Sequence, residues 1–347
     1  MIDFRNDYSQ GAAPQVLDYL IKLGDRSFRG YGEDELCRAA KNRLREMVGM
    51  QRAALHFVSG GTQANLIVLA AMLRPHQGVI AADTGHISVH EAGAIEATGH
   101  KVLALPHREG KLDPLGIQRL VDSHIADESF EHMVQPRAVY LSNATELGTV
   151  YTKDELRAIS QVCRRKGLLL YLDGARLGYA MASEACDLTL PDIAGCCDAF
   201  SIGLTKQGAL FGEAIVIINT SLQKDFRYLI KQRGAMLAKG WLMGAQFEAL
   251  FEGDLYWQLS RHALALAGRL KEGLSKLGVP FLADSPTNQL FPIFDEEVIE
   301  RLAKDYGFNR IESLADGRAA IRFVTHWGSK AEDVEALIRD VGKALGR

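Results

Sequence analysis

Short apolar runs alternate with amphipathic stretches along the first two thirds of the chain. Each run has the length of a buried strand, and the stretches between them place apolar residues at helical spacing, as in Glu33–Val48. Strands that alternate with helices in this way favour an α/β fold with a mainly parallel, seven-stranded sheet. The expected strands span residues 53–58, 78–82, 101–105, 137–141, 168–173, 200–204 and 214–218.

The pattern changes after residue 220, where long apolar stripes predict helices in residues 223–253 and 259–277. The segment Leu277-Gly278-Val279-Pro280 is typical of a linker, and strand 317–325 is expected beyond it. We therefore expect a large domain over residues 1–253 and a small α+β domain over residues 254–347. The polar residues at the start of the large domain, up to residue 32, are expected to be loop-like.

Composition narrows the class of protein. The 347 residues are 47% hydrophobic and 24% charged, which is ordinary for a globular enzyme. A net charge of −3 without a basic cluster argues against nucleic-acid and membrane partners. The first residues lack the pattern of a signal peptide, and no apolar run is long enough to span a bilayer. Five cysteines without a C-x-x-C pair argue against disulfides or a zinc site, so we expect a cytoplasmic protein without a metal.

Two apolar runs end in residues that carry chemistry. One leads into Thr205-Lys206 and the other ends in Asp173. Taken alone, Lys206 is more simply an exposed loop lysine, and Asp173 a helix cap or a member of an ion pair. Together, at the carboxyl ends of parallel strands, they suit pyridoxal phosphate, whose aldehyde a lysine binds and whose pyridinium proton a carboxylate holds. Burial would lower the pKa of the lysine and free its amine for this bond.

Further polar residues follow strands at the same expected edge of the sheet. The turn Ser59-Gly60-Gly61-Thr62 would present backbone N–H groups to an anion, although a plain tight turn is an equal alternative. His86 follows the second strand, and Glu91 lies in the helix that His86 begins. Arg322 suits a substrate carboxylate, and pairing with an acid at the sheet edge is the alternative.

Five segments in a fixed order resemble the threonine aldolases, which are grouped with the aromatic-amino-acid β-eliminating lyases among the fold-type-I pyridoxal-phosphate enzymes. The resemblance extends over nearly the whole chain. It implies helices on both faces of the seven-stranded sheet and a smaller α+β C-terminal domain. The segments are SGGTQANL (59–66), DTGHISVHEAG (83–93), LDGARL (172–177), LTKQG (204–208) and IRFVTHW (321–327).

The resemblance also assigns roles to residues of this chain. Lys206 would bind pyridoxal phosphate covalently, Asp173 would pair with its ring nitrogen, and Arg176 would lie beside the ring. His86 would stack on the ring face. The phosphate would lie against Gly60, Gly61, Thr62 and Thr205, and the substrate carboxylate against Arg322 and Asn6.

Sites of this family form between subunits, so the resemblance implies a homodimer or homotetramer. Tyr31 and either Lys231 or Lys239 would then reach the cofactor of a neighbouring subunit. Without that argument, lysines in a long helical stretch are more simply part of a solvated face.

Two positions depart from the family pattern. Gly60 stands where the phosphate turn usually has a serine, which removes one hydroxyl group. Many members carry a histidine in the loop that corresponds to Asn143–Gly148, and this chain has none there. The base that takes the proton of the substrate hydroxyl is therefore open, with His86, directly or through water, as the first candidate and Glu91 as the second.

The expected reaction is cleavage of the Cα–Cβ bond of L-threonine or L-allo-threonine into glycine and an aldehyde. Two alternatives keep the cofactor and change the reaction, namely β-elimination with release of ammonia and transamination of another amino acid. A non-catalytic nucleotide-binding protein is the alternative from another class. Against it, the glycine turn lacks the G-x-G-x-x-G and G-x-x-x-x-G-K-[ST] patterns.

Overall fold

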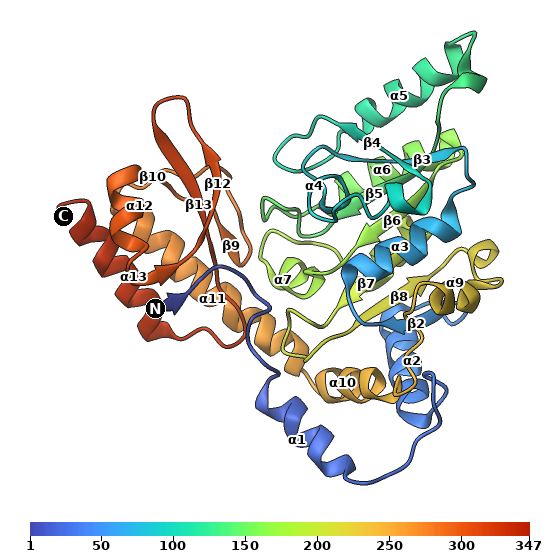
Figure 1. Cartoon of the computed structure of the whole chain (residues 1–347), viewed down its shortest axis with the longest axis horizontal. Coiled ribbons are helices and arrows are strands. Elements are labelled where there is room, and N and C mark those ends of the chain that lie inside the picture. The colour runs from blue at the N-terminus through green and yellow to red at the C-terminus, as the bar shows by residue number, and fades with distance from the viewer.

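A seven-stranded sheet forms the centre of the larger part of the molecule (Figure 1). The computed structural model describes residues 1–347. The strand order is β2-β8-β7-β6-β5-β3-β4, and β8 is antiparallel to both of its neighbours while the other pairs are parallel. The strands are β2 (Ala54–Val58), β3 (Gln77–Ala82), β4 (Lys101–Leu105), β5 (Gln135–Ser142), β6 (Leu169–Asp173), β7 (Ala199–Gly203) and β8 (Glu213–Ile217).

Helices cover both faces of this sheet, and each face buries its own apolar cluster. The larger cluster joins the sheet to α2, α5, α6, α8 and α10, and the second joins it to α3 and α9. The helices and 3-10 turns of this part are α1 (Pro14–Leu23), α2 (Glu35–Val48), α3 (Gly61–Met72), α4 (His86–Val89), η1 (Glu96–Thr98), α5 (Pro114–Ala126), η2 (Phe130–His132), α6 (Lys153–Lys166), α7 (Leu177–Ala182), α8 (Leu190–Cys196), η3 (Thr220–Leu222), α9 (Phe226–Gln232) and α10 (Trp241–Phe251).

Local sequence signals set the ends of these helices. Thr152 caps α6 through the backbone N–H of Glu155, whose side chain accepts in return from the N–H of Thr152. This reciprocal pair satisfies two N–H groups that the first helical turn leaves free. Gly167 ends the helix with a φ of 65°, a conformation that costs little without a Cβ atom.

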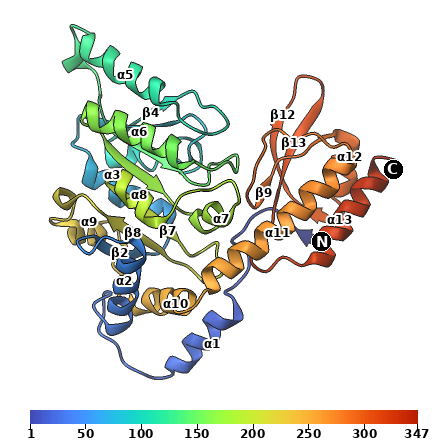
Figure 2. The same cartoon turned by 180° about the vertical axis from the view of Figure 1, so that it is seen from behind.

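The second, smaller part of the molecule lies beside the carboxyl end of the large sheet (Figure 2). Its core is a separate cluster in which α11 and α13 pack on β13. The first strand of the chain, β1, pairs in parallel with β11 in this part. The elements are β1 (Ile2–Asp3), α11 (Leu255–Lys276), β9 (Gln289–Leu290), β10 (Ile293–Asp295), α12 (Glu296–Leu302), β11 (Tyr306–Gly307), β12 (Asn309–Ser313), β13 (Arg318–Val324) and α13 (Ala331–Ala344).

The structure confirms the α/β fold class, the seven strands and the smaller C-terminal α+β part. The domain boundary between residues 253 and 254 stays a prediction. The long helix expected in residues 223–253 is wrong, because the chain forms α9 and α10 with a turn between them. Gly234 has a φ of 69°, and a Cβ atom on Gly240 would lie 2.7 Å from the backbone nitrogen of Gly32. The left-handed backbone at Gly234 therefore breaks the helix, whereas Gly240 leaves room for the backbone of Gly32 just before α10.

The expectation that residues 1–32 are loop-like is also wrong in part. Helix α1 begins at Pro14, and Val16 and Leu23 are buried on its inner face. Proline at the first helical position and Gly24 after the last are ordinary helix boundary signals, and they were available in the sequence.

No helix of the chain is both long enough and apolar enough to cross a membrane.

Candidate active site

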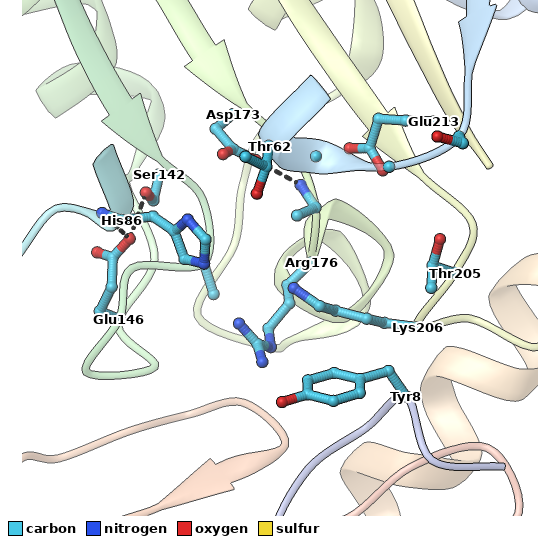
Figure 3. A pocket seen from close by; sticks show the side chains of 15 residues that line it. Tyr8, Thr62, His86, Ser142, Glu146, Asp173, Arg176, Thr205, Lys206 and Glu213 are labelled. Carbon is cyan, nitrogen blue, oxygen red and sulfur yellow. Dashed lines mark hydrogen bonds between the residues drawn. The ribbon is translucent and has the colours of Figure 1, made fainter. Parts of the chain in front are cut away.

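The carboxyl ends of the central strands surround a cavity of about 240 Å³ (Figure 3). The turn after β2, the ends of β5, β6 and β7 and the first residue of β8 all contribute to its lining. It brings together eight of the predicted site residues: Gly60, Gly61, Thr62, His86, Asp173, Arg176, Thr205 and Lys206. Ser59 of the predicted turn also lines it, and six further lining residues were not predicted: Tyr8, Ser142, Ala144, Glu146, Ala175 and Glu213.

Lys206 follows β7 and is half-buried in the cavity wall. Its backbone carbonyl accepts a hydrogen bond from the Tyr179 hydroxyl, while its amine makes no hydrogen bond or ion pair within the chain. Burial, together with the positive charge of Arg176, lowers the pKa of the amine below its ordinary value. A desolvated amine held without a partner is available to bind an aldehyde.

Asp173, the last residue of β6, is held by three donors. Its carboxylate accepts from the Tyr140 hydroxyl at 2.7 Å, from the Asn65 amide at 3.0 Å and from the backbone N–H of Ala175 at 2.9 Å. Burial alone would raise the pKa of Asp173, but the charge of His86 and these hydrogen bonds lower it below its ordinary value. The cavity therefore keeps a fixed negative charge on this wall.

His86 begins α4, and contacts with Glu91 and Glu146 hold it in place. Its Nδ1 atom lies 2.9 Å from the Glu91 carboxylate, which also accepts from Asn65 at 2.8 Å. Because Asn65 bonds to Asp173 as well, His86 and Asp173 are joined through shared partners. Glu91 is buried behind His86 and does not line the cavity. It can orient the imidazole, but it has no direct access to a substrate.

Glu146 was not among the predicted site residues, although it lies in the loop Asn143–Gly148, where the family pattern has a histidine. Its Oε1 atom accepts from the Ser142 hydroxyl at 2.6 Å and from the backbone N–H of His86 at 2.8 Å. Burial raises the pKa of Glu146 above its ordinary value. A carboxyl group therefore occupies the side of the cavity where the loop carries no histidine.

Gly60 precedes α3, and its backbone is extended, with a φ of −176°. A Cβ atom at this position would meet nothing within 4 Å, so the turn leaves open space above the helix. The first N–H groups of a helix have no partner inside it and carry a partial positive charge. With the Thr62 and Thr205 hydroxyls on the same cavity, the turn is suited to a phosphate group.

Arg176 is held by the N-terminal segment instead of lying free beside the cavity. It forms a two-pronged ion pair with Asp7, at 2.8 Å and 3.0 Å, and Asn288 donates to the same carboxylate at 3.0 Å. This pair lowers the pKa of the buried Asp7 to about 2, although burial itself acts in the opposite direction. Residues from three distant parts of the chain thus meet at one ion pair.

The two residues expected at the substrate carboxylate lie outside the lining of this cavity. Arg322 donates to the Gln289 side chain at 3.2 Å and to the Arg5 carbonyl at 3.4 Å, and its buried Nε atom has no partner. The side-chain Oδ1 atom of Asn6 accepts from the backbone N–H of Tyr8 and from the Ser9 hydroxyl. Their role toward a substrate stays a prediction.

The three residues expected to reach a neighbouring subunit lie away from the cavity. The Lys231 amine stands 5.0 Å from the centre of the Tyr31 ring, and both side chains are exposed. Lys239 is exposed as well. Within one chain none of them lines the cavity, and their expected role toward a neighbouring subunit stays a prediction.

The residues present fit pyridoxal phosphate. The fold brings three different groups to one cavity: a desolvated lysine, a buried ionised carboxylate and a glycine turn before a helix. The buried Nε atom of Arg322 also leaves one donor near the cavity for an anionic ligand. Lys206 would hold the aldehyde, Asp173 the ring nitrogen and the turn at Gly60 the phosphate.

Known proteins of similar sequence and structure cover nearly the whole chain. Low specificity L-threonine aldolase of Pseudomonas aeruginosa is 32% identical over 346 residues, which are 99% of this chain and 98% of that protein. The enzyme of the same name from a Pseudomonas species is 30% identical, over 97% of this chain and 96% of that protein.

The structure of the Leishmania major threonine aldolase superposes with a TM-score of 0.96 at 44% identity, over 99% of this chain and all of that one. An aspartate aminotransferase from Thermus thermophilus shares the fold, with a TM-score of 0.74 at 14% identity. The profile of the beta-eliminating lyase family matches residues 3–297. The chain therefore belongs to the beta-eliminating lyase family.

Proposed function

We propose that this protein is a pyridoxal-phosphate-dependent lyase that cleaves the Cα–Cβ bond of L-threonine and L-allo-threonine, giving glycine and acetaldehyde. The observation that carries the proposal is the joint position of Lys206 and Asp173 at one cavity. Relatives named low specificity L-threonine aldolase over the full length of the chain support the same reaction.

Pyridoxal phosphate, when bound, supplies an electron-withdrawing ring that takes up the electron pair of the broken bond. Lys206 would hold its aldehyde carbon in the absence of substrate. Asp173, kept ionised by the charge of His86 and by its three donors, would hold the proton on the ring nitrogen. Arg322, with Asn6, would fix the substrate carboxylate and so orient the Cα–Cβ bond for cleavage.

The proton of the substrate hydroxyl must leave as the bond breaks. We assign this step to His86, directly or through one water molecule, because its ring lies on the cavity while Nδ1 is occupied by Glu91. The free Nε2 atom is then the position that can accept a proton. Glu91 acts through His86, since it has no access to the cavity of its own.

The assembly and location complete the proposal. We propose that the protein forms a homodimer or homotetramer in which Tyr31 and either Lys231 or Lys239 approach the cofactor of a neighbouring subunit. We also propose that it is located in the cytoplasm. The exposed pair of Tyr31 and Lys231, away from its own cavity, supports the first statement. All five cysteines are free thiols, which supports the second.

Product analysis tests the reaction. The cofactor-loaded protein is incubated with L-threonine and with L-allo-threonine, and glycine, acetaldehyde, ammonia and keto acids are quantified. We expect glycine and acetaldehyde in equal amounts without ammonia, and no product from the Lys206→Ala variant. Ammonia with a keto acid would overturn the aldol reaction while keeping the fold and the cofactor.

A further inference from the structure

Glu213 is a buried carboxyl group at the cavity that the reaction above does not use. It is the first residue of β8, only 2% of its surface is exposed, and it lines the cavity together with Thr62 and Thr205 (Figure 3). Its Oε1 atom accepts from the Ser201 hydroxyl at 3.0 Å, which is the one hydrogen bond of the carboxyl group within the chain. One carboxyl oxygen is thus left for a ligand.

The antiparallel pairing of β8 places Glu213 beside the glycine turn. Glu213 lies directly opposite Val58, the last residue of β2, and Ser59-Gly60 follows at once. Gly60 contributes no side chain, and a Cβ atom there would meet nothing within 4 Å. The carboxyl group is therefore next to the part of the cavity where the first N–H groups of α3 can face an anion and where Gly60 itself provides no side-chain donor.

We propose that Glu213, in its protonated form, donates a hydrogen bond to the phosphate of the cofactor at the N-terminus of α3. The proposal rests on the proposed function only in that pyridoxal phosphate is the cofactor. An ionised carboxylate beside a phosphate dianion would repel it, whereas a carboxylic acid supplies a donor. The geometry thus requires that Glu213 keep its proton.

The surroundings of Glu213 favour the protonated form. Burial raises its pKa to about 8, the negative charge of Asp173 on β6 adds to this effect, and the charge of Lys206 opposes it. The other titratable groups around it are Tyr171 on β6 and Tyr256 on α11, whose pKa values burial also raises. His56 on β2 stays neutral, because burial lowers its pKa to about 3. Helix α3 contributes no charged side chain.

A bound dianion would strengthen this preference further. The second pKa of a phosphate monoester is about 6, so the phosphate carries two negative charges above pH 7. Its field stabilises the neutral carboxylic acid against the carboxylate. In the free protein, a pH above about 8 removes the proton from Glu213, and the affinity for the phosphate must then fall.

The test compares binding of pyridoxal phosphate and of pyridoxal, which lacks the phosphate, between pH 7 and pH 9.5. The ratio of the two dissociation constants cancels effects of pH on the lysine and on the aldehyde. In the wild-type protein we expect the advantage of pyridoxal phosphate over pyridoxal to shrink by about 10- to 30-fold over this range, following the loss of one proton. In Glu213→Gln, whose amide donates without titrating, the ratio should be constant.

A second experiment compares the Glu213→Ala variant with the double variant that also carries Gly60→Ser. The alanine variant should lose affinity for pyridoxal phosphate by about tenfold at pH 7, the usual effect of one hydrogen bond to a charged group, and bind pyridoxal as before. Gly60→Ser places a hydroxyl in the open space beside the phosphate, so the double variant should regain most of this affinity. Inorganic phosphate binding to the cofactor-free protein should follow the same order.

Two results would overturn the proposal. One is a wild-type pH dependence that persists in Glu213→Gln. The other is an equal loss of affinity for pyridoxal and pyridoxal phosphate in Glu213→Ala. That result would show that Glu213 acts on Lys206 and not on the phosphate. Neither result touches the aldol reaction, which product analysis tests separately.

Discussion

The wall around Asp173 and the exposed pair of Tyr31 and Lys231 differ in how many of their contacts lie within one chain. The sheet wall around Asp173 is complete, because Tyr140, Asn65 and a backbone N–H already hold the carboxylate. The pair of Tyr31 and Lys231 is exposed, makes one cation–π contact and lies away from the cavity of its own chain. The wall is preorganised by the fold, whereas the role proposed for the exposed pair needs a second subunit to meet it.

This difference teaches which residues should matter for chemistry and which for assembly. A buried group whose donors are already in place needs no reorganisation during the reaction, and its effect on the rate is large. An exposed charge is screened by water and salt, and its effect is small. Substitutions in the two parts should therefore differ by orders of magnitude.

Asp173→Asn should produce the largest effect. The amide keeps the size of the side chain but removes the fixed charge that we propose holds the ring nitrogen, so we expect kcat for L-threonine to fall by about 10³-fold. Steady-state kinetics with saturating cofactor measures it. The matched control is Asp122→Asn, an acid that pairs with Lys166 on the surface and should keep wild-type kcat. Retention of a tenth of the activity in Asp173→Asn would contradict the preorganised wall.

Asp7→Asn should have the next largest effect, on stability. The substitution leaves the buried Arg176 guanidinium without its ion-pair partner, so the free energy of unfolding should fall by about 3 kcal/mol in urea at pH 7. The control is Asp316→Asn, which breaks an exposed pair with Arg318 and should leave the unfolding midpoint unchanged.

The same residue predicts a pH dependence. The pKa of Asp7 is about 2 in the folded protein, below its ordinary value of 3.8, so its contribution is complete above about pH 4 and is lost as the pH falls toward 2. Wild-type protein should lose on the order of 2 kcal/mol more than Asp7→Asn over that interval. Parallel loss of stability in the two proteins would show that Asp7 is not the responsible group.

Lys231→Ala should have the smallest effect. If Lys231 reaches a neighbouring cofactor, its loss should weaken binding of pyridoxal phosphate by about two- to fivefold, because one solvated charge contributes little. Equilibrium dialysis measures the change, and it should shrink at high salt. Lys224→Ala, another exposed lysine of the same region, is the control. Equal affinities for all three proteins would remove Lys231 from the shared site.

The sequence was sufficient for the parts of the site that depend on strand ends. Lys206 and Asp173 follow apolar runs, and parallel strands bring such ends to one edge, so their meeting could be predicted. Glu213 could not be found in this way, because it is the first residue of a strand. Only the antiparallel direction of β8 brings that residue to the same edge.

The ion pair of Asp7 and Arg176 was missed for a different reason. The two residues are 169 positions apart, and no local periodicity relates them. Tyr140 and Asn65 were missed because each reads as an ordinary member of a core strand or helix. Their polar ends face Asp173 only after the elements pack, so the signal lies in tertiary structure and not in the pattern of the chain.

The path of the N-terminal segment has a consequence for synthesis on the ribosome. Phe4 donates its N–H to the Gly307 carbonyl and accepts from the N–H of Val324, and Asp7 bonds to Asn288, 281 residues further along. These partners emerge from the ribosome long after residues 2–7 have been made. The large sheet can form before that moment, but the Arg176 guanidinium has its full set of neighbours only afterwards. The site around Arg176 can therefore be completed only after the chain has been made beyond Asn288.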